Sequence, residues 1–115
     1  LQQVYRLAQN PITAQNTVRN LAARLNLSES TLSKTFKKMS GMTLDRYLNT
    51  LLLDRACQLL LVSYMSIGEI ASSLAFCDAY YFSRYFKKNM GMTPTCYRKL
   101  RINDSINYPY PEHPL

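Results

Sequence analysis

The apolar residues of this chain recur every three or four positions, which is the spacing of one face of an α-helix. Residues 2–9 are expected to form a first helix that ends before Asn10, because proline follows at the next position. Thr17 is a suitable N-cap for a second helix that runs to about Leu25. The apolar face of that helix consists of Val18, Leu21, Ala22 and Leu25.

A third helix and a long fourth helix should follow. Ser28 is expected to cap a helix through about Ser40, which Gly41 ends in the left-handed conformation. Thr43 should cap a helix that continues to residue 62. Its apolar residues lie on two sides, with Leu44, Tyr47, Leu48, Leu51, Leu52, Leu59 and Leu60 on one and Leu53, Cys57 and Leu61 on the other. This distribution predicts a connecting helix that is buried on two sides, rather than a membrane-surface or coiled-coil helix.

The second half of the chain repeats the first. Residues 32–47 and 82–97 share eight identities in sixteen positions, where average composition predicts about one. The identical pairs are Ser33/Ser83, Phe36/Phe86, Lys37/Lys87, Lys38/Lys88, Gly41/Gly91, Met42/Met92, Thr43/Thr93 and Tyr47/Tyr97. Upstream the offset falls from 50 to 49, and the aligned pairs are Thr17/Ser66, Val18/Ile67, Leu21/Ile70, Ala22/Ala71, Leu25/Leu74 and Leu27/Phe76. Each copy is therefore predicted to hold a helix, a turn and a second helix.

The second copy carries its own start and stop signals. Ser66 and Glu69 have the spacing of a capping box, and the next helix should cover about residues 78–90 and stop at Gly91. Thr93 before a proline predicts a last short helix that ends near Arg101. Residues 102–115 contain three prolines and no apolar period, so they are expected to be a disordered tail.

The predicted fold is all-α, with about seven helices in one small body. Residues 1–42 are expected to form a first helix-turn-helix subdomain and residues 43–62 the connecting helix. Residues 63–101 should form a second helix-turn-helix subdomain, followed by the tail at 102–115.

Charge and composition narrow the function. The net charge is +7, and residues 17–60 and 61–101 each carry about +4, which favours polyanionic partners. Three cysteines, Cys57, Cys77 and Cys96, lack metal-site spacing, and the single histidine is His113, so no metal or cofactor is predicted. The cysteines are expected to be buried or half-buried free thiols. No apolar run approaches the ~18 residues of a membrane span, and a cytoplasmic protein is expected.

In each copy the second helix should have a core face and an exposed face. Leu32 and Phe36 are expected to pack on Leu21 and Leu25, and Phe82 and Phe86 to form the matching core. The exposed residues are then Ser30, Ser33, Lys34 and Lys37 in the first copy and Ala79, Tyr80, Ser83, Arg84 and Lys87 in the second. Small hydroxyls near the helix N-terminus and cations further along suit the DNA major groove. A single basic helix would be better explained as a solvated surface, but its duplication in register favours DNA.

Phosphates should supply most of the affinity, and the exposed helix faces should supply the discrimination between bases. The predicted phosphate-binding residues are Thr17, Lys37, Lys38, Ser66, Lys87, Lys88 and Thr93. Arg84 can donate two hydrogen bonds to one guanine, whereas its equivalent, Lys34, is a point charge, so the first copy should discriminate less sharply. The connecting helix would extend roughly 30 Å, close to the ~34 Å between successive major grooves on one face of DNA.

These residues closely resemble the DNA-binding region of the AraC/XylS family of bacterial transcription regulators. The likeness covers about residues 5–101 and is strongest in Ser66–Ala71, Leu74–Lys88 and Gly91–Pro94, with Tyr97 and Arg98. The resemblance implies seven helices, with two recognition helices in adjacent major grooves, and activation or repression of transcription. By position it implies that the bases are contacted by Ser30, Thr31, Ser33, Lys34, Ala79, Tyr80, Ser83 and Arg84. Arg55, in the connecting helix, matches an arginine that is common in the family.

Two places depart from the family pattern. The connecting helix has Asn49 to Leu53 where relatives are usually basic, and Cys77 replaces a small hydroxyl or acidic residue before the second recognition helix. This chain is therefore expected to differ from its relatives in two features. These are the phosphate contacts from the connecting helix and the N-cap of that recognition helix. Neither departure affects the expected fold.

Three functional classes can be compared. The leading one is a sequence-specific double-stranded DNA-binding domain of a regulator that also contacts RNA polymerase. Relatives usually carry an N-terminal effector or dimerisation domain, so the chain is either the C-terminal part of such a protein, which the missing initiator Met favours, or a DNA-binding domain alone. The alternative is a basic helical module that docks on an acidic protein such as RNA polymerase. An enzyme is the weakest class, since no general base and nucleophile pair can be assembled.

Overall fold

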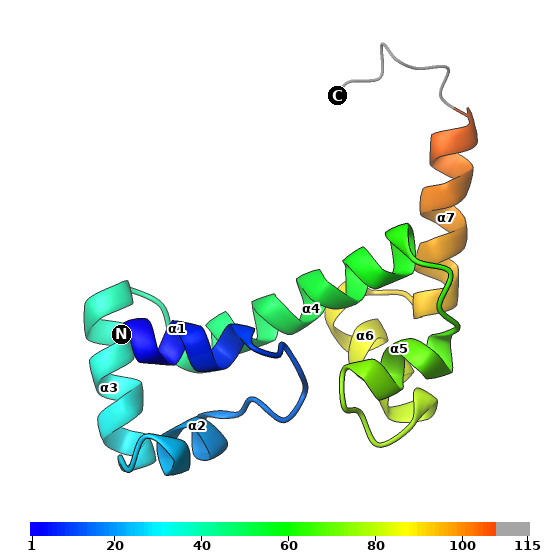
Figure 1. The fold of residues 1–115 in the computed structure, drawn as a ribbon. Helices are drawn as coiled ribbons and strands as arrows, with labels where there is room; N and C mark the ends of the chain where they lie inside the picture. The colour runs from blue at the N-terminus through cyan, green and yellow to red at the C-terminus, as the bar shows by residue number, and fades with distance from the viewer. Residues whose placement is uncertain (108–115) are drawn as a thin grey trace.

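Seven helices and no strand make up residues 1–107, the part of the chain that the computed structural model describes, with side chains described to residue 101. The helices are α1 (Gln2–Gln9), α2 (Val18–Arg24), α3 (Glu29–Ser40), α4 (Leu44–Val62), α5 (Ile67–Ser73), α6 (Ala79–Met90) and α7 (Pro94–Asn107). Figure 1 shows α4 joining two groups, α1 to α3 at one end and α5 to α7 at the other. The predicted all-α fold is confirmed. Within residues 1–107, none of the helices combines the length and the hydropathy of a membrane span.

Side-chain caps fix the helix starts where the sequence predicts them. The Thr17 hydroxyl accepts a hydrogen bond from the Asn20 N–H at 3.1 Å, and Ser28 and Thr43 have the same role in α3 and α4. The capping box of α5 is complete, because Ser66 accepts from the Glu69 N–H at 3.0 Å and the Glu69 carboxylate accepts from the Ser66 N–H at 2.8 Å.

The two predicted stop signals are also present. Gly41 ends α3 with a φ of 81° and Gly91 ends α6 with a φ of 84°. Both values lie in the left-handed region, where a side chain would be strained, so glycine is the natural residue at both positions.

The predicted end of the last helix was wrong. α7 begins at Pro94, and Thr93 caps it by accepting from the Cys96 N–H, but the helix continues past Arg101 to Asn107. No proline or glycine interrupts residues 95–108, and a helix that has started gains one hydrogen bond for each residue added. Residues 102–107, expected to be disordered, are therefore helical, while the rest of the predicted tail, 108–115, lies outside the described residues.

Two apolar clusters form the core, and α4 contributes to both. The first cluster joins α1, α2 and α3 to Leu44 and Leu48 of α4, and the second joins α5, α6 and α7 to the later turns of α4. The buried residues of α4 in the second cluster are Leu52, Ala56, Leu59 and Leu60. The prediction that the connecting helix packs on both units is confirmed. Leu61 was expected on its second apolar side but is exposed, because only Leu59 and Leu60 of the last turn face the cluster.

α7 also completes the end of α4. The Arg98 guanidinium donates to the Leu60 carbonyl at 2.8 Å and to the Leu59 carbonyl at 3.4 Å. These carbonyls belong to the last turn of α4, where no further helical N–H is available to them. Arg98 therefore acts as a C-terminal cap supplied from another helix.

Candidate nucleic-acid interface

Each unit places one helix of its helix-turn-helix pair over a small apolar core. In α3 the buried residues are Leu32 and Phe36, which pack with Leu21 and the half-buried Leu25. In α6 they are Phe82 and Phe86, both completely buried. The core prediction is confirmed for both helices, and their remaining sides face outward.

The eight predicted base-contacting residues lie on these outward sides, four in each helix. In α3, Ser30, Thr31 and Lys34 are exposed and Ser33 is half-buried. In α6, Tyr80 and Arg84 are exposed, whereas Ala79 and Ser83 are half-buried. Each set spans the first two turns of its helix, where a major groove would receive it.

The two outward faces differ in detail. The Arg84 guanidinium lies 5.5 Å from the centre of the Tyr80 ring, within the range of a cation–π contact. The equivalent positions in α3 are Ser30 and Lys34, which have no aromatic ring. In addition, the Thr31 hydroxyl accepts a hydrogen bond from the Ser28 hydroxyl at 2.8 Å, so it is partly engaged in the cap of α3.

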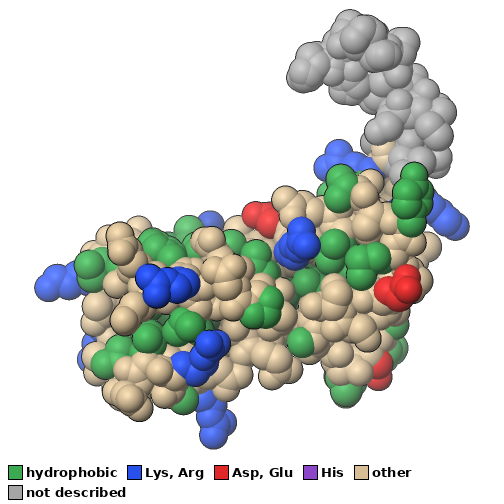
Figure 2. All heavy atoms as spheres, in the orientation of Figure 1, with side chains coloured by type: hydrophobic (Ala, Val, Ile, Leu, Met, Phe, Trp, Pro, Cys, Tyr) green, Lys and Arg blue, Asp and Glu red, His purple; other side chains and the backbone are tan. Residues whose placement is uncertain are grey.

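Four of the predicted phosphate-binding residues are exposed lysines in equivalent places. Lys37 and Lys38 lie in the last turn of α3, and Lys87 and Lys88 in the last turn of α6. On the face shown in Figure 2, Lys and Arg side chains gather mainly over the end that holds α1 to α3, and Asp and Glu lie over the rest. Both units therefore present a pair of exposed lysines at the end of the helix that carries the predicted base-contacting residues.

The three hydroxyl residues predicted to bind phosphate, Thr17, Ser66 and Thr93, are exposed but already serve as caps. Any anion there would bind to the free N–H groups of the first helical turn. At α5 the Glu69 carboxylate occupies this turn and would repel a phosphate. The structure thus makes Ser66 the least suitable of the three.

One departure from the family pattern has a structural role that the sequence did not reveal. The Asn49 amide of α4 donates to the Asn89 side chain of α6 at 3.3 Å and accepts from the Tyr85 hydroxyl. Burial raises the pKa of Tyr85 to about 12. Asn49 therefore holds the recognition helix α6 on α4. This structural role differs from the phosphate contact that a basic residue at this position would make.

The other departure does not weaken the start of α6. Asp78 is the N-cap, and its carboxylate accepts from the Tyr81 N–H at 3.0 Å. Cys77, one residue earlier, takes no part in the cap. All three cysteines are free thiols, but Cys77 and Cys96 are exposed rather than buried. Cys77 precedes the N-cap of α6, and Cys96 lies in the first turn of α7, outside its core face. Cys57 is half-buried, as expected.

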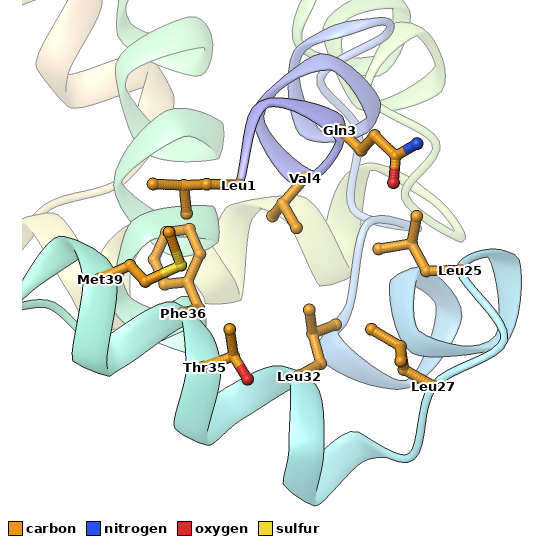
Figure 3. A pocket seen from close by; sticks show the side chains of 9 residues that line it. All are labelled: Leu1, Gln3, Val4, Leu25, Leu27, Leu32, Thr35, Phe36 and Met39. Carbon is orange, nitrogen blue, oxygen red and sulfur yellow. The ribbon is translucent and has the colours of Figure 1, made fainter.

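An apolar pocket of about 250 Å³ opens in the first unit, on the side of α3 away from the predicted interface. Figure 3 shows its lining, which comprises Leu1, Gln3, Val4, Leu25, Leu27, Leu32, Thr35, Phe36 and Met39. Lys34 and the other predicted base-contacting residues are absent from this lining. The pocket therefore lies outside the predicted interface.

Comparison with known proteins places this geometry in a family. A model of the helix-turn-helix domain family matches residues 21–100, which is more than half of the chain. The chain belongs to the AraC-type helix-turn-helix family. This AraC-type domain is 38% identical over 79 residues to the MmsAB operon regulatory protein of Pseudomonas aeruginosa. That alignment covers 69% of this chain and 26% of the regulator, so the chain spans about a quarter of that relative's length.

Solved structures agree with the fold. The C-terminal domain of the two-component response regulator yesN from Fusobacterium nucleatum superimposes with a TM-score of 0.74 at 33% identity, over 84% of this chain and 95% of that one. The DNA-binding domain of AdpA, solved in complex with a target DNA, gives a TM-score of 0.76 at 25% identity. That match covers 92% of this AraC-type domain and 96% of the AdpA chain.

Proposed function

We propose that this AraC-type domain binds double-stranded DNA sequence-specifically, with α3 and α6 in adjacent major grooves. The observation that carries the proposal is the duplicated outward face, with hydroxyl or aromatic residues early in each helix and cations later. The 19 residues of α4 correspond to about 28 Å, somewhat less than the ~34 Å between grooves on one face of the duplex. A modest bend of the DNA would remove the difference.

The proposal divides the work between residues. Lys37, Lys38, Lys87 and Lys88 neutralise phosphates and supply most of the affinity. Arg84 supplies the sharpest base contact, because its planar guanidinium can donate two hydrogen bonds to guanine. Tyr80 holds the guanidinium in place through the cation–π contact, so Arg84 has fewer side-chain rotamers before binding and loses less conformational entropy when it binds DNA.

In the longer protein we propose that the domain regulates transcription in the bacterial cytoplasm and contacts RNA polymerase at the promoter. The MmsAB operon regulatory protein is a regulator, and this chain spans about a quarter of its length, which leaves room for an N-terminal effector or dimerisation domain. Within the described residues we propose binding rather than catalysis, since α3 and α6 present cations and hydroxyls and not a general base beside a nucleophile.

A salt titration of DNA binding tests the proposal. A protein that neutralises 6–10 phosphates should lose roughly 10³–10⁵ in affinity between 50 and 200 mM salt, while it keeps a preference for its own site. Binding that shows neither salt dependence nor site preference would contradict DNA recognition and would favour the module that docks on an acidic protein.

Two variants that each lose one positive charge distinguish a contact made by α6 from an effect of net charge. Lys87→Ala removes a predicted phosphate contact and should lower the slope of log affinity against log salt by about one. Arg101→Ala removes one positive charge from α7, outside the predicted contacts, and should leave the slope unchanged. Equal slopes for the two variants would show that net charge, and not this face of α6, governs binding.

A further inference from the structure

The segment between α1 and α2 contacts the opposite unit. The Ala14 N–H donates to the Leu74 carbonyl at 2.7 Å, and the Gln15 side chain donates to the Ala75 carbonyl at 3.4 Å. The side chains of Ile12 and Ala14 pack against the second apolar cluster, although the helices on both sides of this segment belong to the first. In Figure 1 the segment extends from α1 toward α5.

The receiving site is the turn of the second helix-turn-helix. Leu74 is the C-cap of α5, and Ala75 follows it with a φ of 63°, in the left-handed conformation that reverses the chain toward α6. The segment therefore binds only four residues before the recognition helix begins at Ala79. A contact at this point acts on the position of α6 itself.

The segment is held in shape by its own hydrogen bonds. The Asn16 side chain donates to the Ala8 carbonyl at 3.0 Å and to the Pro11 carbonyl at 2.7 Å. The Asn20 side chain of α2 donates to the Gln15 carbonyl at 2.6 Å. Both ends of the segment are thus fixed to the first unit, so its contact with the second unit restricts motion between the units, which a flexible linker would not do.

We propose that residues 12–15 form a second connection between the units, beside α4, that sets the distance and angle between α3 and α6. A single helix allows the bodies at its two ends to bend and twist relative to each other, whereas a second contact away from the helix axis opposes both motions. The consequence, which rests on the proposed function, is that the domain accepts only one spacing between its two DNA half-sites. Residues 12–15 are positioning residues, since they act on specificity through α6.

The orientation of the units can be measured without DNA. Residual dipolar couplings of backbone N–H groups, recorded in a weakly aligning medium, should fit one alignment tensor for α2 and α3 together with α5 and α6. Ala14→Pro removes the donor to Leu74, and Ile12→Ala removes only a side-chain contact and so guards against misfolding of the proline variant. In either variant we expect the couplings of the two units to require different tensors, while the helix chemical shifts stay unchanged.

Leu7→Ala is the matched control. Leu7 is half-buried like Ile12, but it packs within the first cluster only. Its loss should leave one common tensor. If Ile12→Ala and Ala14→Pro also keep one common tensor, the proposed connection is wrong, whatever the domain does with DNA.

The second arm uses duplexes with zero, one or two base pairs inserted between the half-sites. Two inserted base pairs should weaken binding of the natural sequence by about tenfold or more, because one half-site loses its base contacts. Ile12→Ala should bind the original spacing less tightly and show a penalty for insertion of only about twofold to threefold, since its units adjust at a low cost. An unchanged insertion penalty would overturn the proposal, whereas failure of every protein to prefer a site would overturn the proposed function and leave the dipolar-coupling result valid.

Discussion

The two helix-turn-helix units have the same plan and different interiors. Both units contain ring contacts, but the second has more of them. There they join Phe76, Phe82, Tyr85, Phe86 and Tyr97, with centroids 5.2–6.0 Å apart. In the first unit they join Tyr5, Phe36 and Tyr47, with centroids 5.3–5.8 Å apart. In the first unit Leu27 stands where Phe76 stands in the second, and it is 43% exposed beside the apolar pocket. The two units thus share their helices and caps, while the first unit has the smaller aromatic cluster and an apolar pocket beside it.

The outward faces differ in the same sense. α6 presents Arg84 stacked on Tyr80, and α3 presents Lys34 with Ser30 in the equivalent places. A fixed guanidinium discriminates between bases, whereas a flexible ammonium mainly binds charge. From this contrast we predict that the second unit discriminates between bases more sharply than the first, which mainly binds phosphates.

The largest effect should come from the cores. Phe86→Ala should cost about 3–5 kcal/mol in free energy of unfolding, because the ring is completely buried between Phe82 and Tyr97. Phe36→Ala, its counterpart, should fall at the lower end of that range, since Phe36 borders the pocket and the space can open to water. Urea unfolding of both variants measures the difference, and a larger loss for Phe36→Ala would contradict the contrast between the cores.

The next effect concerns the recognition helices. Arg84→Lys keeps the charge and removes the two-bond donor, so discrimination at one G·C pair should fall by about 1–3 kcal/mol. Lys34→Ala should change base preference less than Arg84→Ala does. Competition binding against single base-pair variants of both half-sites gives the comparison, with total affinity as the control for lost charge. Equal loss of base preference from Lys34→Ala and Arg84→Ala would contradict the prediction that the second unit discriminates between bases more sharply than the first.

A smaller effect is a pH-dependent stability that only the second unit should show. Tyr85, whose counterpart in the first unit is Thr35, donates to Asn49, and Tyr85→Phe should cost about 0.5–1.5 kcal/mol at neutral pH. Burial raises the pKa of Tyr85 from 10.0 to about 12, so the unfolded chain loses this proton at a lower pH than the folded chain. The stability linked to the proton is complete below pH 10 and is lost as the pH rises to about 12.

Chemical unfolding at several pH values between 8 and about 12 tests this linkage. The stability gap between the natural sequence and Tyr85→Phe should narrow over that range. Asn49→Ala is the control, because it removes the acceptor and leaves the phenol in place, and it should therefore retain the alkaline loss. A gap that stays constant with pH would show that Tyr85 does not carry the effect.

The smallest effect concerns the caps. Ser66→Ala breaks the reciprocal capping box of α5, and because Ser66 is exposed the cost should lie near the lower end of the about 0.5–2 kcal/mol typical of N-caps. Thr17→Ala should cost less, since α2 has a single cap bond and no carboxylate partner. Thermal unfolding of the pair gives the order, and a greater loss from Thr17→Ala would reverse this part of the comparison.

Sequence reasoning succeeded where the signals are local. These signals lie within a few residues of the structure that they specify. Examples are the caps Ser28 and Thr43, the two glycine stops, and the spacing of the core residues Phe82 and Phe86. Helical spacing also predicted which sides of α3 and α6 face outward, and the residues proposed to contact DNA stay a prediction on those sides. The end of α7 lies beyond the predicted boundary because residues 95–107 contain no proline or glycine, and the prolines that suggested a tail begin only at Pro109.

The contacts that position the interface depend on tertiary structure. Tyr85 and Asn49 are 36 residues apart, and Arg98 and Leu60 are 38 apart. Gln15 and Ala75 are separated by 60 residues. No periodicity or capping rule pairs such residues, and each pairing exists only because two units fold onto one connecting helix.

In-vitro selection of bound DNA from a random pool tests the central claim most directly. The account predicts two conserved half-sites about one helical turn apart, with the more sharply defined half-site lost when the selection is repeated with Arg84→Ala. A single half-site, two half-sites at variable spacing, or a pattern that Arg84→Ala leaves unchanged would contradict it.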